Sequence, residues 1–460
     1  MDVKDLRSAG IYVPYEQIPI ETVTEVKCRL LDSVLALIGG ALAMPADELS
    51  TIADLVQENG NVRPVWPSDI STNLEMAGFL NAYFMRYADW GDTYRRAGGI
   101  GGHPSDQLAA ILALAGTQAV SGRSIIELTH MAYQLWYSLQ EGMMKSRRDL
   151  DYTTTLALTI PLLAGTCFEV SPERMQDALN ISASGGAVLE QVRTGGTTNL
   201  KSAASAYAIA RGFWCYRISE AIHAPDSIFD GKYGWYNVFA PLESELTGSG
   251  EMAYQPLEIK NYACFNGAQA SVECMVNLSD TLKGKLENIR RIAIRVSSVD
   301  AGVVIRPGQA DYPATQADAD HNLKYCAATA LQFGALTPLH FSSAYLENAK
   351  TRRLIDVIDV GVLSESESAA LNNRDGSCLV EITMDDGAEM FASCERAAGI
   401  LSGLEPDVRL ERLHDIIDGK RRMAESAGRF DLTRVKDIIF SLEKYEGYAL
   451  IDAIQAELQR

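Results

Sequence analysis

The sequence predicts a mostly α-helical protein with a smaller α+β domain inserted before its C-terminal end. Apolar residues follow helical spacing through residues 1–255. Period-two alternation, which is typical of half-buried strands, then appears within residues 256–395. Helical spacing returns over residues 396–460. We therefore predict a large all-helical domain, an α/β lid domain that interrupts it, and C-terminal helices that return to the first domain.

Two segments carry the helical prediction for the first domain. An early amphipathic helix is indicated by apolar residues that share one face, namely Val23, Val26, Leu30, Val34 and Leu37. The run 203–210 consists almost entirely of small residues, so we expect a helix that packs tightly among others.

The α/β domain shows strands, a turn and a helix. Residues 291–296 and 379–384 alternate between apolar and polar side chains. Asp385, Asp386 and Gly387 follow the second run and predict a tight hairpin turn. Residues 322–333 carry helical spacing between the two predicted strands. Strands and helices therefore alternate in this region.

Composition excludes several classes of partner. A net charge of −19 over 460 residues argues against nucleic acid, which requires a basic surface. An anionic substrate must then be met by a local cluster of Lys and Arg. The most apolar stretch, residues 156–168, is interrupted by polar residues and proline, and the N-terminus has no apolar signal segment, so we expect a cytoplasmic protein with no membrane contact.

Cysteine and histidine usage bears on metals and cofactors. The eight cysteines are scattered without a C-x-x-C arrangement, and the six histidines are equally dispersed. That pattern is typical of reduced thiols and does not supply the ligand spacing of a zinc or iron–sulfur site. We expect no metal and no cofactor.

One motif places a histidine at the mouth of a helix. Asp89 and Asp92 precede a glycine-rich stretch and then His103-Pro104-Ser105-Asp106. Proline suits a first helical turn, Ser105 or Asp106 can cap it, and free N–H groups there favour anions. Histidine titrates near neutrality, so His103 is a candidate general acid or base. The structural alternative is a capped surface loop.

Three further segments carry candidate residues for the site. Residues 193–201 place Gly and Thr before a helix start, which indicates either a backbone anion nest with Lys201 or a capping loop with a solvated lysine. Lys260 lies where the chain enters the α/β region. Tyr325 lies one helical turn beyond His321, where it serves either the site or the packing of the core.

In order and spacing these segments resemble the MmgE/PrpD family, which includes 2-methylcitrate dehydratases, cis-aconitate decarboxylases and an iminodisuccinate epimerase. Residues 89–93 and 102–106 look like the family's D-x-x-D-T and H-P-S-D signature. Lys201 falls at its helix-start lysine, and Lys260 in its I-K segment. The resemblance extends over nearly the whole chain.

The α/β region resembles the dehydratase branch in particular. Residues 267–273 are similar to its A-Q-x-A-V-E run, and residues 317–325 match it better than the decarboxylase branch. The resemblance implies a homodimer with a cleft between a helical domain and a lid. In such enzymes a 3-hydroxy tricarboxylate loses water without an iron–sulfur cluster.

The resemblance also implies roles for individual residues. His103 and Tyr325 are the candidates for proton transfer, with the order open. Lys201 and Lys260 are expected to bind carboxylates and the developing negative charge. Asp89, with the neighbouring aspartate, is expected to orient His103 and keep it basic.

A second group is expected to bind the substrate, with Arg147 and Arg148 adding positive charge nearby. This group consists of Asp92, Thr93, Tyr152, Arg193 and Gln269. Two positions depart from the dehydratases, because Tyr152 and Gly267 stand where that branch carries histidines. The resemblance implies 2-methylcitrate as the substrate, and because both departures fall at presumed cleft positions we also expect that another 2-alkylcitrate-like acid can take its place. The alternatives are decarboxylation or epimerisation of a related polycarboxylate, and polycarboxylate binding without catalysis.

Overall fold

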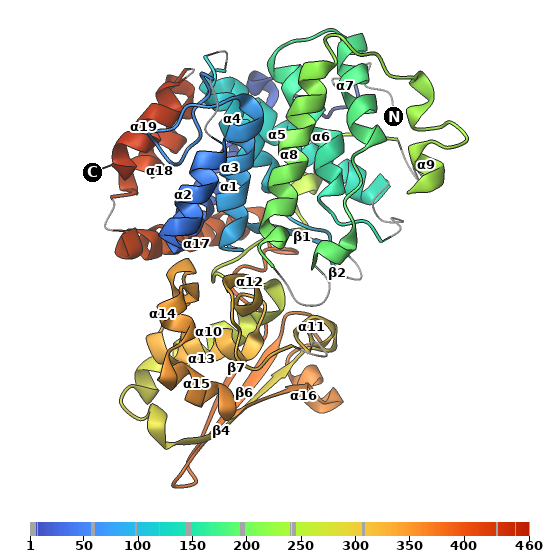
Figure 1. Ribbon diagram of the computed structural model, residues 1–460. Coiled ribbons are helices and arrows are strands. Elements are labelled where there is room, and N and C mark those ends of the chain that lie inside the picture. Colours follow the sequence, from blue (N-terminus) through green and yellow to red (C-terminus); the bar gives the residue numbers. More distant parts are fainter. Residues whose placement is uncertain are drawn as a thin grey trace.

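The protein has a helical part and an α/β part, which form the upper and lower halves of the computed structural model in Figure 1. The structure describes residues 6, 8–56, 60–96, 99–118, 120–142, 149–193, 198–239, 241, 245–305, 309–428, 431–446 and 448–459. The expected mostly helical fold with an α+β part is confirmed.

Helix α1 (Ile20–Ala43) lies at the centre of the helical part and is buried along almost its whole length. Around it and one another pack α2 (Ala46–Val56), α3 (Leu74–Tyr87), α4 (Asp106–Ala115), α5 (Gly122–Gly142), α6 (Thr154–Cys167), α7 (Pro172–Ser184) and α8 (Leu200–Ile218). Helix α8 is the small-residue helix expected from the sequence. It packs closely on α3, where a Cβ at Gly78 would lie 2.8 Å from side-chain atoms of Ile209 and Phe213.

Two of the three C-terminal helices pack against α1, and the last packs against the helix before it at the left of Figure 1, although all three come from the opposite end of the chain. They are α17 (Pro406–Gly428), α18 (Thr433–Phe440) and α19 (Ala449–Leu458). Buried ion pairs join α17 to α1, from Lys420 to Asp32 and from Arg409 to Glu25. A buried charge is tolerated only when it is paired, so these contacts fix the position of α17 on α1.

The α/β part is built on a four-stranded mixed sheet in the order β5-β4-β6-β7. Its strands are β4 (Ile289–Val296), β5 (Ile358–Val362), β6 (Cys378–Met384) and β7 (Glu389–Cys394). Helix α10 (Gln269–Leu282) packs on β6 and β7, and α13 (Leu323–Phe333) on β5 and α10. The remaining helices are α11 (Ser298–Val304), α12 (Gln316–Ala319), α14 (Ser343–Leu346), α15 (Ala349–Asp356) and α16 (Glu365–Ala370), with the short α9 (Trp235–Val238) in the helical part.

Residues 1–255, which were expected to form an all-helical domain, also contain two short strands. Strand β1 (Asp92–Arg96) pairs antiparallel with β2 (Gly99–Ile100) on one side and with β3 (Leu257–Ile259) on the other. The pairing sets Thr93 opposite Glu258. This small sheet brings the aspartate-rich loop of the helical part next to the segment that leads into the α/β part, and thereby positions the site.

Among the described residues, no single helix is long and apolar enough to cross a bilayer; α1 and α2 reach that length and composition only as a pair, bent by 115°.

Candidate active site

A cavity of about 170 Å³ lies where the two parts of the protein meet. The helical part contributes Asp89, Arg95 and His103 to its lining. The α/β part contributes Lys260, Phe265, Asn266, Gly267, Val299, Asp300, Val303 and His321. The volume lies below the range of pockets for drug-sized ligands and suits a small organic acid. A larger groove of about 720 Å³ between α2, α3 and α8 is lined mainly by apolar residues and contains none of the motif residues.

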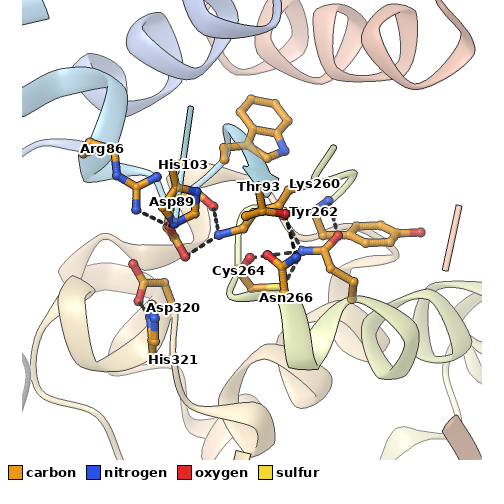
Figure 2. A network of polar contacts seen from close by, with 12 residues as sticks. Arg86, Asp89, Thr93, His103, Lys260, Tyr262, Cys264, Asn266, Asp320 and His321 are labelled. Carbon is orange, nitrogen blue, oxygen red and sulfur yellow. Dashed lines mark hydrogen bonds and ion pairs between the residues drawn. The ribbon is translucent and has the colours of Figure 1, made fainter. Parts of the chain in front are cut away.

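Asp89 is the centre of the charged network in Figure 2. One carboxylate oxygen accepts from Arg86 at 2.7 Å, and the other lies 2.7 Å from the Lys260 ammonium. Lys260 also donates to the Asp89 carbonyl at 3.1 Å. Burial by itself raises the pKa of Asp89, but Lys260, Arg86 and Lys201 more than offset it and hold the pKa well below its usual range. Asp89 is therefore ionised, with both oxygens already paired.

His103 is held in a defined tautomer. Its Nδ1 lies 2.6 Å from the main-chain oxygen of Asp92. A carbonyl oxygen only accepts hydrogen bonds, so Nδ1 carries the proton and Nε2 carries the lone pair when the ring is neutral. Nε2 lies 4.0 Å from the nearest Asp89 oxygen, which is beyond hydrogen-bond distance. The main chain at Asp92, not the Asp89 side chain, orients the ring.

His103 is also neutral, which corrects the expectation that the aspartates keep it basic. Burial, followed by the positive charges of Arg86 and Lys260, lowers its pKa well below the usual value, and Asp89 offsets this only in part. The side chain is 8% exposed, so the desolvation penalty on an imidazolium is large. A neutral imidazole with a lone pair on Nε2 is ready to accept a proton near neutral pH.

Asp92 and Thr93, which were expected to bind substrate, lie outside the cavity lining and hold neighbouring elements of the site together. Asp92 accepts from the Ser105 N–H at 3.0 Å and from the Tyr133 hydroxyl at 2.9 Å, and is fully buried. Asp92 thus binds an N–H group at the start of α4, where the sequence had indicated Ser105 or Asp106 as the cap. Thr93 is fully buried and accepts from the Asn266 amide at 2.7 Å, which ties β1 to the α/β part.

A second histidine faces the cavity from the α/β part. His321 follows α12, and its Nδ1 lies 3.0 Å from the Lys201 ammonium and in contact with Asp320. Lys201 is 1% exposed and bound to both Asp320 oxygens at 2.8 Å, so it reaches the cavity only through His321. Burial and the charge of Lys201 lower the pKa of His321 to about 4. Lys201, which was expected to bind a carboxylate, therefore lies behind His321 and outside the cavity lining.

Tyr152 and Arg193 lie behind His103. The Tyr152 ring meets the His103 ring edge-on at 5.3 Å, and its hydroxyl donates to Asp106 at 3.2 Å. Arg193 stacks on Tyr152 with its guanidinium carbon 4.5 Å from the ring centre, and pairs with Asp151. Neither of these side chains, which were expected to bind substrate, is among those that line the cavity. Arg147, Arg148 and the expected anion nest at 194–197 lie outside the described residues.

Gln269 and Tyr325 lie outside the cavity lining, and their polar groups bond to the main chain. The Gln269 amide accepts from the N–H groups of Asn261 and Tyr262 at 3.1 Å and donates to the Tyr262 carbonyl at 2.9 Å, so it shapes the loop after Lys260. Tyr325 is fully buried and its hydroxyl donates to the main-chain oxygen of His340. The helical turn that separates Tyr325 from His321 directs the tyrosine into the core of the α/β part.

Sequence reasoning missed several residues of the cavity and its support. Arg95, Asn266, Asp300 and His321 line the cavity, and Arg86 anchors Asp89 from the last turn of α3. His321 and the preceding Asp320 belong to the same motif as Tyr325. The sequence contains no information on which of these side chains points into the cavity, and this direction was all that the choice between His321 and Tyr325 required.

A cation position in the site is already filled by protein groups. Ligand-type atoms of Asp89, Asp320 and His321 lie within 4.8 Å of one another, close enough together to hold one metal ion. The ammonium groups of Lys260 and Lys201 lie 2.7 Å and 2.8 Å from these two carboxylates. Two fixed positive charges at the same carboxylates disfavour an additional cation.

The fold and site together define a class, namely two-part proteins with a small acid/base pocket at the junction. Residues 11–245 match the MmgE/PrpD N-terminal domain and residues 262–401 the MmgE/PrpD C-terminal domain. The chain belongs to the MmgE/PrpD family. It is similar to the 2-methylcitrate dehydratases of Escherichia coli strains K12 and O157:H7, with 24% identity over 302 residues in each case. The match covers 61% of this chain, and the chain spans 60% of the length of each relative.

Proposed function

We propose that this protein is a lyase that removes water from a small hydroxy polycarboxylate such as 2-methylcitrate or a related 2-alkylcitrate. The observation that carries the proposal is the pair His103 and His321, which face one small cavity together with the cations Lys260 and Arg95. Family membership and the similarity to 2-methylcitrate dehydratases support dehydration as the reaction.

In the first half of the reaction, His103 Nε2 takes the proton from a carbon next to a carboxylate. The pair of electrons left on carbon moves toward that carboxylate, whose charge grows. Lys260 and Arg95 line the cavity and stabilise this charge electrostatically. The imidazolium that forms lies 4.0 Å from the Asp89 carboxylate, which stabilises it in turn. A base of this kind contributes about 10²–10⁴-fold to the rate.

In the second half, the carbon–oxygen bond breaks and the hydroxyl group leaves as water. His321 Nδ1 is bonded to the Asp320 carboxylate, which only accepts, so Nδ1 carries the proton and the neutral ring presents Nε2 as an acceptor for the substrate hydroxyl. The proton that His103 took from carbon passes from its Nε2 to the departing hydroxyl. The balance is one C–H and one C–O bond broken, one carbon–carbon double bond and one water formed, and His103 returned to its neutral form. Neither step uses a metal ion.

The experiment that tests the proposal is a product assay on the purified protein. It would be incubated with 2-methylcitrate and with citrate, and the alkene, carbon dioxide and epimerised acid would each be quantified. We expect alkene without carbon dioxide, at a rate unchanged by prolonged chelator treatment. Carbon dioxide or epimer as the main product would instead establish the related reactions, and binding without turnover a polycarboxylate-binding protein. Loss of turnover that Fe or Zn restores would contradict metal-free catalysis.

A further inference from the structure

One group of cavity-lining side chains takes no part in the proposed proton transfers. Phe265, Val299 and Val303 line the same cavity as His103 and His321 but carry only carbon at their tips. Val299 and Val303 stand four residues apart on α11, so they share one face of that helix. Each is 42% exposed, which leaves apolar surface that a ligand in the cavity can cover.

Local packing fixes the position of this apolar wall. The Phe265 ring stacks on the His321 ring at 5.2 Å with an interplanar angle of 20°. A Cβ at Gly267 would lie 3.0 Å from Val304 and 3.1 Å from Phe265, so a larger residue there would displace the ring or the helix. The wall therefore adjoins the histidine proposed to accept a hydrogen bond from the leaving hydroxyl. A substituent near that hydroxyl comes to lie against it.

We propose that Val299 and Val303 determine substrate specificity by binding an alkyl group longer than methyl on the hydroxy acid. This inference rests on the proposed dehydratase function. Side chains four residues apart on a helix are about 5–6 Å from each other, so a methyl group contacts one valine whereas an ethyl group contacts both. One additional methylene in an apolar pocket is worth about tenfold or more in kcat/KM.

The test compares 2-methylcitrate with 2-ethylcitrate as substrates. For each acid, kcat/KM and the dissociation constant by calorimetry would be measured for the wild type and for Val299→Thr/Val303→Thr. Threonine keeps the shape of valine and replaces one methyl by a hydroxyl, so the cavity volume is preserved. The matched control is Val408→Thr, since Val408 is 45% exposed near the start of α17, outside the cavity lining.

We expect the wild type to prefer the ethyl acid by about tenfold and the double variant to lose that preference. Val408→Thr should keep it. A preference that is unchanged in the double variant, or a wild type that favours the methyl acid, overturns the inference. If neither acid is turned over, the proposed function fails, and the ratio of the two dissociation constants then tests the specificity by itself. Equal affinities of the wild type for the two acids overturn the inference. A wild-type preference for the ethyl acid that the double variant loses supports it.

Discussion

Replacement of His103 by asparagine separates its proposed chemistry from its structural role. The asparagine amide nitrogen lies close to where Nδ1 lies in histidine, so it can still donate to the Asp92 oxygen now 2.6 Å from Nδ1. What the variant lacks is the Nε2 lone pair. His103→Asn should therefore fold as the wild type does while it loses the base.

The size of the expected fall in kcat follows from the role of His103 as the base. Removal of a positioned base lowers kcat by about 10²–10⁴-fold, or about 3–5 kcal/mol of transition-state stabilisation. KM should change little, because the cations that bind carboxylates remain in place. In the wild type the base is active only when neutral, and its pKa is held well below 6.5. Activity is thus present at pH 7 and is lost only as the pH falls well below 6.5.

The assay is steady-state alkene formation by the wild type and the variant, with kcat/KM recorded against pH for the wild type. His130→Asn is the matched control, because His130 is also buried but bonds to the Tyr254 hydroxyl at 2.8 Å and does not line the cavity. It should keep kcat. A His103→Asn enzyme that retains near wild-type kcat would refute the assignment of the base, and an acid limb at or above pH 6.5 would refute the argument from burial.

Three further outcomes are expected. Lys260→Gln should raise KM and lower kcat about tenfold or more, and should reduce stability by roughly 1–3 kcal/mol in denaturant unfolding, because Asp89 keeps Arg86 but loses the second of its two cations; unchanged KM and kcat in this variant would show that Lys260 is only structural. Tyr325→Phe should leave kcat within about threefold, since the hydroxyl serves the core; a hundredfold fall would reinstate Tyr325 in proton transfer. Burial lowers the pKa of His130 to about 4, so the unfolded chain binds more protons than the folded one between pH 6.5 and 4, and stability is lost as the pH falls through that window. From pH 7 to 5, His130→Asn should lose roughly 2 kcal/mol less stability than the wild type, and an equal loss in both would contradict the assigned shift.

The sequence by itself determined the elements whose signals are local. Helical spacing and the small-residue run predicted α1 and α8, and alternation predicted β4 and the β6–β7 hairpin around Gly387, whose φ is +84°. These predictions held because the side-chain period of a helix or strand depends on neighbours within one or two turns. The position of His103 just before α4 was likewise evident from the order of residues.

Tertiary structure decided which of the motif residues meet in the cavity. Asp89 and Lys260 are 171 positions apart in the chain, and Lys201 and Asp320 are 119 positions apart. In each pair the ammonium nitrogen nevertheless lies within 2.8 Å of a carboxylate oxygen. Spacing along the chain gave no means of foreseeing that the lysines would be paired with aspartates. It also left the choice between His321 and Tyr325 open, because a side chain's direction at a helix start depends on what packs around it.

Tertiary structure also decided the protonation state of His103. From the sequence, the two aspartates were expected to keep His103 basic. In the folded protein Arg86 and Lys260 approach the same ring and burial removes its water, so the neutral form prevails. A pKa depends on the dielectric and on every charge within several ångströms, and both are properties of the assembled fold that local sequence does not contain.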